Sequence, residues 1–164
     1  MDGLKEALIG AMEAYFQGDA RRISHARQVT ACAEELLEKD GGDYPVVIGA
    51  AVLHDIGIHA AEEKYGSTAG HYQEREGPPI ARRILNGLGF AQEQTDEICQ
   101  IIAHHHSPGK IDSRNFKILY DADWLVNLKD EYDIQDRRKL SGIINRVFLT
   151  ESGRMLARNI YLQA

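Results

Sequence analysis

The segment 44–56 restricts the fold of this chain more than any other part of the sequence. It has Pro45 at a helix-start position, and the residues after it are apolar on every side of a helix. Such a helix belongs in the centre of a protein, surrounded by other elements. It nevertheless ends in His54-Asp55, where an unpaired buried carboxylate would cost several kcal/mol. We therefore expect a central helix whose terminal Asp55 is neutralised by a partner.

The chain has 164 residues, which is enough for one domain with a sizeable core, and we expect a single domain over 1–164. Its longest wholly apolar run, 46–53, is far shorter than the roughly 20 residues of a membrane span. The N-terminus carries acidic residues and lacks the basic start and long apolar centre of a secretory signal. We expect no membrane association and a cytoplasmic location.

The charge balance argues against general nucleic-acid binding. Nineteen basic residues stand against 25 acidic ones, for a net charge of −6, and no block of five or six basic residues occurs. A protein that follows a phosphate backbone needs a basic surface. Cys32 and Cys99 stand singly, without the paired spacing of a zinc or redox motif, so we expect free buried thiols.

Apolar residues recur every three or four positions along most of the chain, which is the spacing of amphipathic helices. No segment shows the sustained alternation of a β-strand, so the predicted fold class is all-α, with about seven or eight helices and no sheet. The segment 59–76 has two glycines and few apolar residues, and we expect a loop there with at most a short helix. The predicted helices span about 2–17, 19–39, 44–56, 78–88, 91–105, 115–130 and 136–149, with Pro78 and Pro79 opening the fourth, and Thr150 caps a last helix.

Several side chains of the types that bind metals stand where the pattern predicts an apolar residue or a helix end. They are His25, the pair His54-Asp55, the pair His104-His105, and Asp123. Imidazole nitrogens and carboxylate oxygens suit divalent transition metals. Periodicity does not choose between Asp121 and Asp123, because both flank the apolar arc of their helix almost symmetrically.

The spacing of these residues resembles the HD-domain superfamily of metal-dependent phosphohydrolases, an all-α family. His25, with Val29 and Ala33 at the following turns, is similar to the first motif of that family, and AAVLHDIG at 50–57 is similar to its defining segment. The resemblance covers roughly 20–160 and implies a compact helical bundle with a motif-bearing core at about 20–130 and flanking helices packed on it. In that family one His, the His-Asp doublet and a later Asp hold a metal. The resemblance therefore implies a metal site made of His25, His54, Asp55 and Asp123, the last of these in YDADWL.

Some members of the superfamily bind a second metal through further histidines. His71 occupies the place of one such histidine, and His104-His105 resemble the adjacent pair of a two-metal subgroup. Consecutive helical residues diverge by about 100°, so the three histidines 104–106 can face one centre only if the helix unwinds near Pro108. We expect one or two divalent ions (Mn, Zn, Co, Fe, Ni or Mg), with His71 and His104 as the favoured extra ligands and His105 as a further candidate. The Gly-Tyr-Pro motif of the cyclic-dinucleotide subgroup is missing, so cleavage of cyclic di-GMP is not expected.

The predicted function is a metal-dependent phosphohydrolase, a phosphomonoesterase or phosphodiesterase for a small phosphate ester such as a nucleotide or related metabolite. A divalent cation lowers the pKa of bound water and withdraws charge from a phosphoryl oxygen, and Asp55 would act as the catalytic residue that orients the attacking water. Lys64, Arg75 and Lys110 are candidate phosphate contacts in predicted loops. The alternatives are an HD-domain di-iron oxygenase and a non-catalytic regulatory domain that binds a nucleotide.

Overall fold

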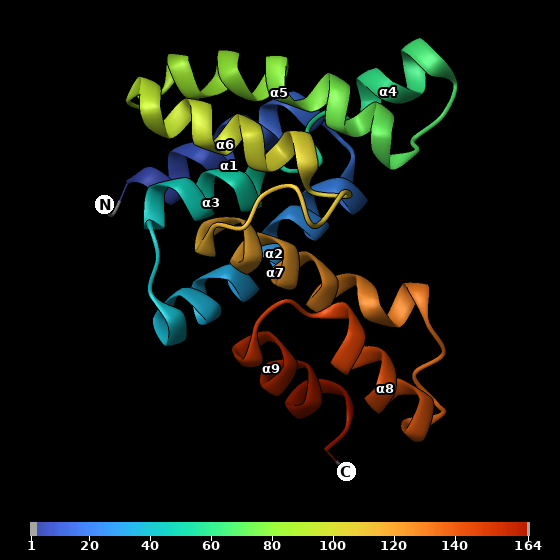
Figure 1. The fold of residues 1–164 in the computed structure, drawn as a ribbon. Helices are drawn as coiled ribbons and strands as arrows, with labels where there is room; N and C mark the ends of the chain where they lie inside the picture. The colour runs from blue at the N-terminus through green and yellow to red at the C-terminus, as the bar shows by residue number, and fades with distance from the viewer. Residues whose placement is uncertain (1–2, 164) are drawn as a thin grey trace.

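The structure is a computed structural model that describes residues 3–163. Those residues form nine α-helices and no strand, so the all-α prediction is confirmed, although the sequence indicated only seven or eight helices (Figure 1). Residue 2 of the predicted first helix, and residues 1 and 164 of the predicted domain, lie outside the described residues. The helices are α1 Leu4–Phe16, α2 Ala20–Asp40, α3 Tyr44–Leu53, α4 Ile58–Tyr65, α5 Gly70–Gly87, α6 Gln92–His104, α7 Arg114–Glu131, α8 Arg137–Val147 and α9 Glu151–Tyr161.

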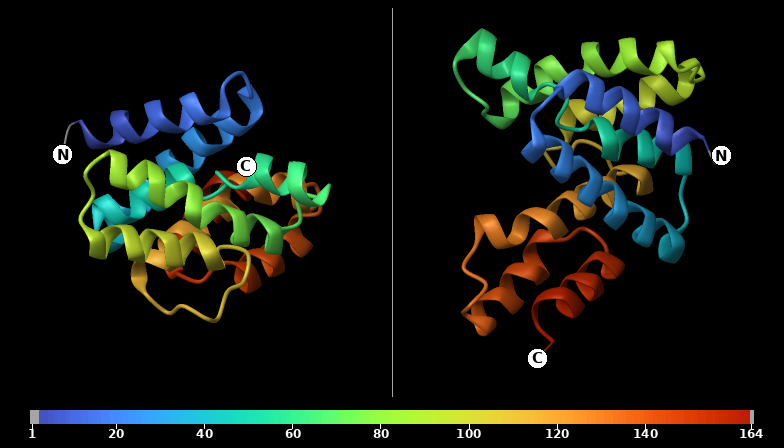
Figure 2. Two further views of the ribbon diagram at one scale, coloured as in Figure 1. Left: turned by 90° about the horizontal axis from the view of Figure 1, so that it is seen from above. Right: turned by 180° about the vertical axis from the view of Figure 1, so that it is seen from behind.

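Helix α3 is the centre of the fold, as its composition predicts. Every residue from 46 to 53 is buried, and α3 contacts α1, α2, α6 and α7 (Figures 1 and 2). Its start is fixed by Asp43, whose side chain accepts a hydrogen bond from the backbone N–H of Val46. Gly49 allows a close approach of α6, because a Cβ atom there would lie 2.6 Å from Cδ1 of Ile98.

The continuous segment Tyr44–Tyr65 is long and apolar enough to resemble a membrane span by composition alone. Most of this segment is buried inside the fold, and a turn at 54–57 divides it into α3 and α4. The same apolar composition is required of the core helix of a helical bundle. We therefore interpret the segment as the core of the bundle.

The region 59–88 differs from the sequence prediction. Two helices replace the expected loop, and α5 begins at Gly70 and continues through Pro78 and Pro79 instead of starting there. A proline inside a helix removes one backbone hydrogen bond, which normally favours a break. Here the buried face of α5 runs without interruption through the prolines and packs on α4 and α6, and this packing outweighs the lost bonds. The buried residues are Gln73, Gly77, Ile80, Ala81 and Leu85.

Two glycines bring the backbone of the turn after α3 directly against α5. A Cβ atom on Gly57 would lie 2.5 Å from the backbone nitrogen of Gly77 and 2.9 Å from the carbonyl oxygen of Gln73. No side chain larger than hydrogen fits at Gly57 without moving one of the two segments. The turn that carries Asp55 is therefore held against α5 by its main chain.

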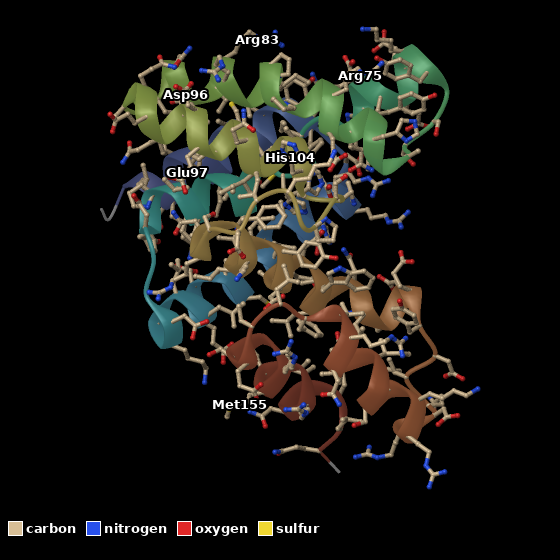
Figure 3. All side chains as sticks on the ribbon, in the orientation of Figure 1. Arg75, Arg83, Asp96, Glu97, His104 and Met155 are labelled. Atoms are coloured by element: carbon tan, nitrogen blue, oxygen red, sulfur yellow. The ribbon has the colours of Figure 1, made fainter. Side chains whose placement is uncertain are left out.

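The helices at the two ends of the chain contact the core helices. Leu8, Met12 and Phe16 of α1 are buried, and α1 contacts α2 and α3. At the other end α9 contacts α2, α7 and α8, and its buried residues belong to the same apolar cluster as those of α1. The opposite side of α9 is exposed at Met155 (Figure 3).

Candidate metal centre

Three segments far apart in the sequence bring four possible metal ligands to one point. His25 comes from the first half of α2, His54 and Asp55 follow α3, and Asp123 comes from α7. The Nε2 atoms of His25 and His54 are 3.2 Å apart. Oδ1 of Asp123 lies 3.1 Å from Nε2 of His25 and 3.3 Å from Nε2 of His54. Oδ2 of Asp55 lies 3.4 Å and 3.3 Å from the same two nitrogens.

Local hydrogen bonds orient these ligand atoms. Nδ1 of His54 lies 2.8 Å from the carbonyl oxygen of Ala51, which can only accept, so Nδ1 carries the proton and Nε2 faces the cluster. On α7, Nδ2 of Asn127 donates to Oδ1 of Asp123 at 2.8 Å. The two residues are one helical turn apart and share a face of α7. The backbone of α3 and the side chain of Asn127 thus hold the ligand atoms in place.

Tertiary contacts separate the roles of Asp121 and Asp123, which the sequence periodicity left open. Asp121 is fully buried away from the cluster and accepts hydrogen bonds from the backbone N–H groups of Leu149 and Thr150, at 2.8 and 3.0 Å. The hydroxyl of Thr150 donates to it at 2.6 Å. Burial raises the pKa of Asp121, and these hydrogen bonds oppose that rise. Asp121 therefore anchors the start of α9, and Asp123 is the aspartate that joins His25 and His54.

A second group of possible ligands shares Asp55 with the first. It consists of Asp55, His105 and His106, at the point where α6 ends. Nδ1 of His105 donates to the carbonyl oxygen of Ile102, at 2.6 Å, so its buried Nε2 carries a lone pair and lies 3.4 Å from Oδ1 of Asp55. That Nε2 atom has no hydrogen-bond partner among the described residues.

Comparison with known proteins agrees with this arrangement. The model of the HD domain family matches residues 22–128, a range that contains His25, the pair at 54–55 and Asp123. The chain belongs to the HD-domain family. A crystal structure described as that of a predicted HD superfamily hydrolase, from an uncultured Thermotogales bacterium, is similar to this HD domain with a TM-score of 0.70 and 27% sequence identity. The similarity covers 94% of this chain and 83% of that one, whereas no curated protein matches the chain.

The charges of the HD site depend on one another. Burial alone would lower the pKa of His54, but the carboxylates of Asp55 and Asp123 outweigh burial and raise that pKa well above its usual value. Burial alone would raise the pKa of Asp55, but His54 and His105 hold it well below its usual value. The pKa of Asp123 is lowered in the same way, by His54 and His25. Without a cation, the cluster therefore stays ionised near neutral pH, with a positive charge on His54 opposite the carboxylates of Asp55 and Asp123.

The donor set fits a divalent metal. When the rings of His54 and His105 are neutral, their protons are on Nδ1. Their Nε2 atoms then present lone pairs to the anionic oxygens of the carboxylates. Either a second proton on each ring or a cation between the groups removes this repulsion. His25, His54, Asp55 and Asp123 would hold such a cation, and the partnerless Nε2 of His105 would extend the set. Nitrogen and carboxylate ligands suit zinc, manganese, iron and cobalt alike.

The favoured extra ligands, His71 and His104, are not among the residues that the structure brings together. His71 is exposed on α5, and its ring contacts that of Tyr72, with centroids 4.0 Å apart and planes tilted by 44°. His104 remains helical, and its Nδ1 bonds to the carbonyl oxygen of Gln100 in the same helix (Figure 3). His105 caps α6 with helical backbone angles and continues the buried face of Ile98 and Ile102, so it turns inward in place of His104. His105 is thus the predicted extra histidine that reaches the cluster.

The site opens into a cleft of about 380 Å³ between α2 and α7. The expected phosphate contacts lie elsewhere, since Lys64 pairs with Glu76, Arg75 lies over the ring of Tyr65, and Lys110 does not line the cleft. The sequence analysis missed the polar residues that do line it, although those on α2 and α7 lie within about two turns of a predicted ligand. They are Arg21, Arg22, Ser24, Gln28, Gln73, His106, Asn127, Lys129, Asp130 and Glu131.

Proposed function

We propose that this HD domain is a metal-dependent phosphohydrolase that acts on a small phosphate ester, a nucleotide or a related metabolite. The observation that carries the proposal is the position of the ligand group at the cleft: His25, Asp55 and Asp123 all line it. Its volume of about 380 Å³ suits a small molecule. The family and its similarity to a predicted hydrolase support hydrolysis as the reaction class.

In this proposal each residue of the centre has a defined task. His25, His54, Asp55 and Asp123 hold the divalent cation, which when bound lowers the pKa of a coordinated water and withdraws charge from a phosphoryl oxygen. Asp55 is shared by both ligand groups and also lines the cleft, so its carboxylate is placed to accept a hydrogen bond from the attacking water. Asn127 keeps Asp123 in position, since it donates to the same oxygen that faces the histidines.

Metal analysis of protein purified without chelators, followed by a phosphatase and phosphodiesterase screen with several divalent ions, tests the proposal. We expect bound divalent metal and turnover that chelation abolishes and metal restores. Asp55→Ala should lose both metal and turnover, because it removes an oxygen from each ligand group. The matched control is Asp112→Ala, which removes a carboxylate that is exposed and pairs only with Lys117 among the described residues. Turnover that persists in metal-free protein would refute the mechanism.

One observation favours a second candidate, the di-iron oxygenase. Asp55 belongs to both ligand groups, as expected of a carboxylate between two metals. Iron in the purified protein together with oxygen uptake in the presence of an organic substrate would favour this function. Tight binding of a nucleotide to metal-replete protein without turnover would instead indicate the regulatory domain.

A further inference from the structure

Three cations line the cleft beside the ligand group. Arg21, Arg22 and Lys129 line the cleft, and none of them forms an ion pair with another described residue. Elsewhere among the described residues, seven basic side chains pair with acids and others, such as Lys39, Arg83 and Lys110, do not, so the gathering of three cations in one cleft is what distinguishes this set. The paired residues are Lys5, Arg27, Lys64, Arg82, Lys117, Arg154 and Arg158. In a chain with a net charge of −6, unpaired cations gathered in one cleft indicate an anionic ligand.

These cations lie beside the ligand group and not within it. Arg21 and Arg22 precede His25 by about one turn of α2, and Lys129 follows Asp123 by nearly two turns of α7. With a rise of about 1.5 Å per residue, they begin roughly 5 to 9 Å from the metal ligands along the helix axes. Because α2 begins and α7 ends on the same side of the molecule, all three gather at one end of the cleft (Figures 1 and 2).

The wall between the ligand group and these cations is polar. Ser24 and Gln28 line it from α2, and Asn127 lines it from α7, whereas Ile58 and Val126 are its apolar members. No Phe, Tyr or Trp of the described residues lines the cleft. A nucleobase is usually held by stacking on aromatic or apolar side chains, whereas hydroxyl groups are held by polar ones. This wall therefore suits a hydroxylated molecule better than a base.

We propose that the cleft binds a phosphate ester with a second anionic group, in the way that a sugar or polyol bisphosphate carries two phosphates. The reacting phosphate lies at the ligand group, the second anion lies between Arg21, Arg22 and Lys129, and the hydroxylated body lies along the polar wall. Asp130 and Glu131 also line the cleft next to Lys129 and repel anions, so the second anion has to contact the cations directly. The inference rests on the proposed function for the reacting phosphate only, since the second-anion subsite can be tested by binding.

The binding test uses pentane-1,5-bisphosphonate and pentylphosphonate, a pair of non-hydrolysable probes that differ in one anionic group. Calorimetry on metal-loaded protein should show that the bisphosphonate binds about tenfold more tightly or better, because a charge-assisted contact contributes that much. The double variant Arg22→Gln/Lys129→Gln should abolish this preference. Lys39→Gln is the control, because it removes an equal type of charge from the distant end of α2 and should keep the preference.

The catalytic test compares glucose 1,6-bisphosphate with glucose 6-phosphate, and adenosine 3′,5′-bisphosphate with adenosine 5′-monophosphate. The double variant should lower kcat/KM for glucose 1,6-bisphosphate about tenfold more than for glucose 6-phosphate. In the unaltered protein, kcat/KM should be higher for glucose 1,6-bisphosphate than for adenosine 3′,5′-bisphosphate. Equal binding of both phosphonates, or an equal loss in the Lys39→Gln control, would overturn the second-anion subsite. A higher kcat/KM for the adenosine bisphosphate would overturn the hydroxylated body. If no ester is hydrolysed but the binding preference holds, the proposed function fails and the subsite stands.

Discussion

Replacement of Asp121 by alanine should destabilise the protein without emptying the metal site. Its carboxylate accepts three hydrogen bonds, from two backbone N–H groups and one hydroxyl, all at the start of α9. Alanine would leave these three donors without their partner. Gly153 packs directly against the same carboxylate, so the substitution also leaves a cavity between α7 and α9.

The expected loss follows from these contacts. A hydrogen bond to a charged group contributes about 1.5–3 kcal/mol, and three such bonds set the upper limit. Two effects make the loss smaller than this limit. Leu149 and Thr150 are only half-buried, so water can replace some of the lost hydrogen bonds. Burial of the carboxylate is unfavourable and raises the pKa of Asp121, so it offsets part of the free energy that the hydrogen bonds contribute. We expect a net loss of about 3 kcal/mol in the free energy of unfolding. For a chain of this size that corresponds to a drop in Tm of roughly 6–12 °C.

Chemical denaturation and metal analysis of Asp121→Ala and Asp123→Ala, measured side by side, check this reasoning. Asp121→Ala should lose stability and keep its metal. Asp123→Ala should lose metal, because its Oδ1 atom faces both histidines. If Asp121→Ala melts like the wild type, or loses metal while keeping its stability, the assignment of the two aspartates is wrong.

Three further predictions follow from the packing and the charges. Gly49→Ala should lower the free energy of unfolding by about 1–3 kcal/mol, because its Cβ would lie 2.6 Å from a side chain of α6. The control Gly10→Ala, which has open space around it, should be neutral or stabilising in thermal melts. After chelation, the free energy of unfolding should be greatest between about pH 4 and 6.5. The pKa values of Asp55 and Asp123 are lowered in the folded protein, so their stabilising contribution is complete above pH 3.8 and is lost in more acidic solution. The pKa of His54 is raised, so its contribution is complete below pH 6.5 and is lost as the pH rises through the raised pKa. Denaturant melts across pH test this, and a divalent ion should restore stability at pH 8. The intact chain should melt in one calorimetric transition, since both terminal helices share the apolar core, and two separated transitions would contradict a single domain.

Periodicity predicted the helical fold, and the resemblance to the HD-domain family implied the four side chains that converge, of which His54 and Asp55 also break a strong local pattern. His54 and Asp55 end the most apolar helix, and His25 lies beside an amphipathic stripe. The choice of Asp123 needed the family resemblance, since both aspartates flank the same arc of α7. What separates them physically is the start of α9, which lies far along the chain and takes up Asp121 alone.

The incorrect expectations concern helix ends and helix faces. His105 continues the buried face of Ile98 and Ile102, so the preference for His104 chose the residue on the wrong face of α6. The start of α5 was missed because packing on α4 and α6 keeps Pro78 inside a helix. With that helix in place, Gln73 faces the cleft and His71 faces outward. No local signal in the sequence marks Gln73.

The contact between Gly57 and Gly77 has a consequence for altering this protein. Because main chain meets main chain there, no side chain separates the turn that carries Asp55 from α5 at this point. Most residues that line the cleft project from α2 and α7, whereas Gln73 of α5 lies at the contact itself. Libraries that vary the cleft wall at Ser24, Gln28 and Val126 should therefore change which molecule binds, while Asp55 keeps its position relative to α5.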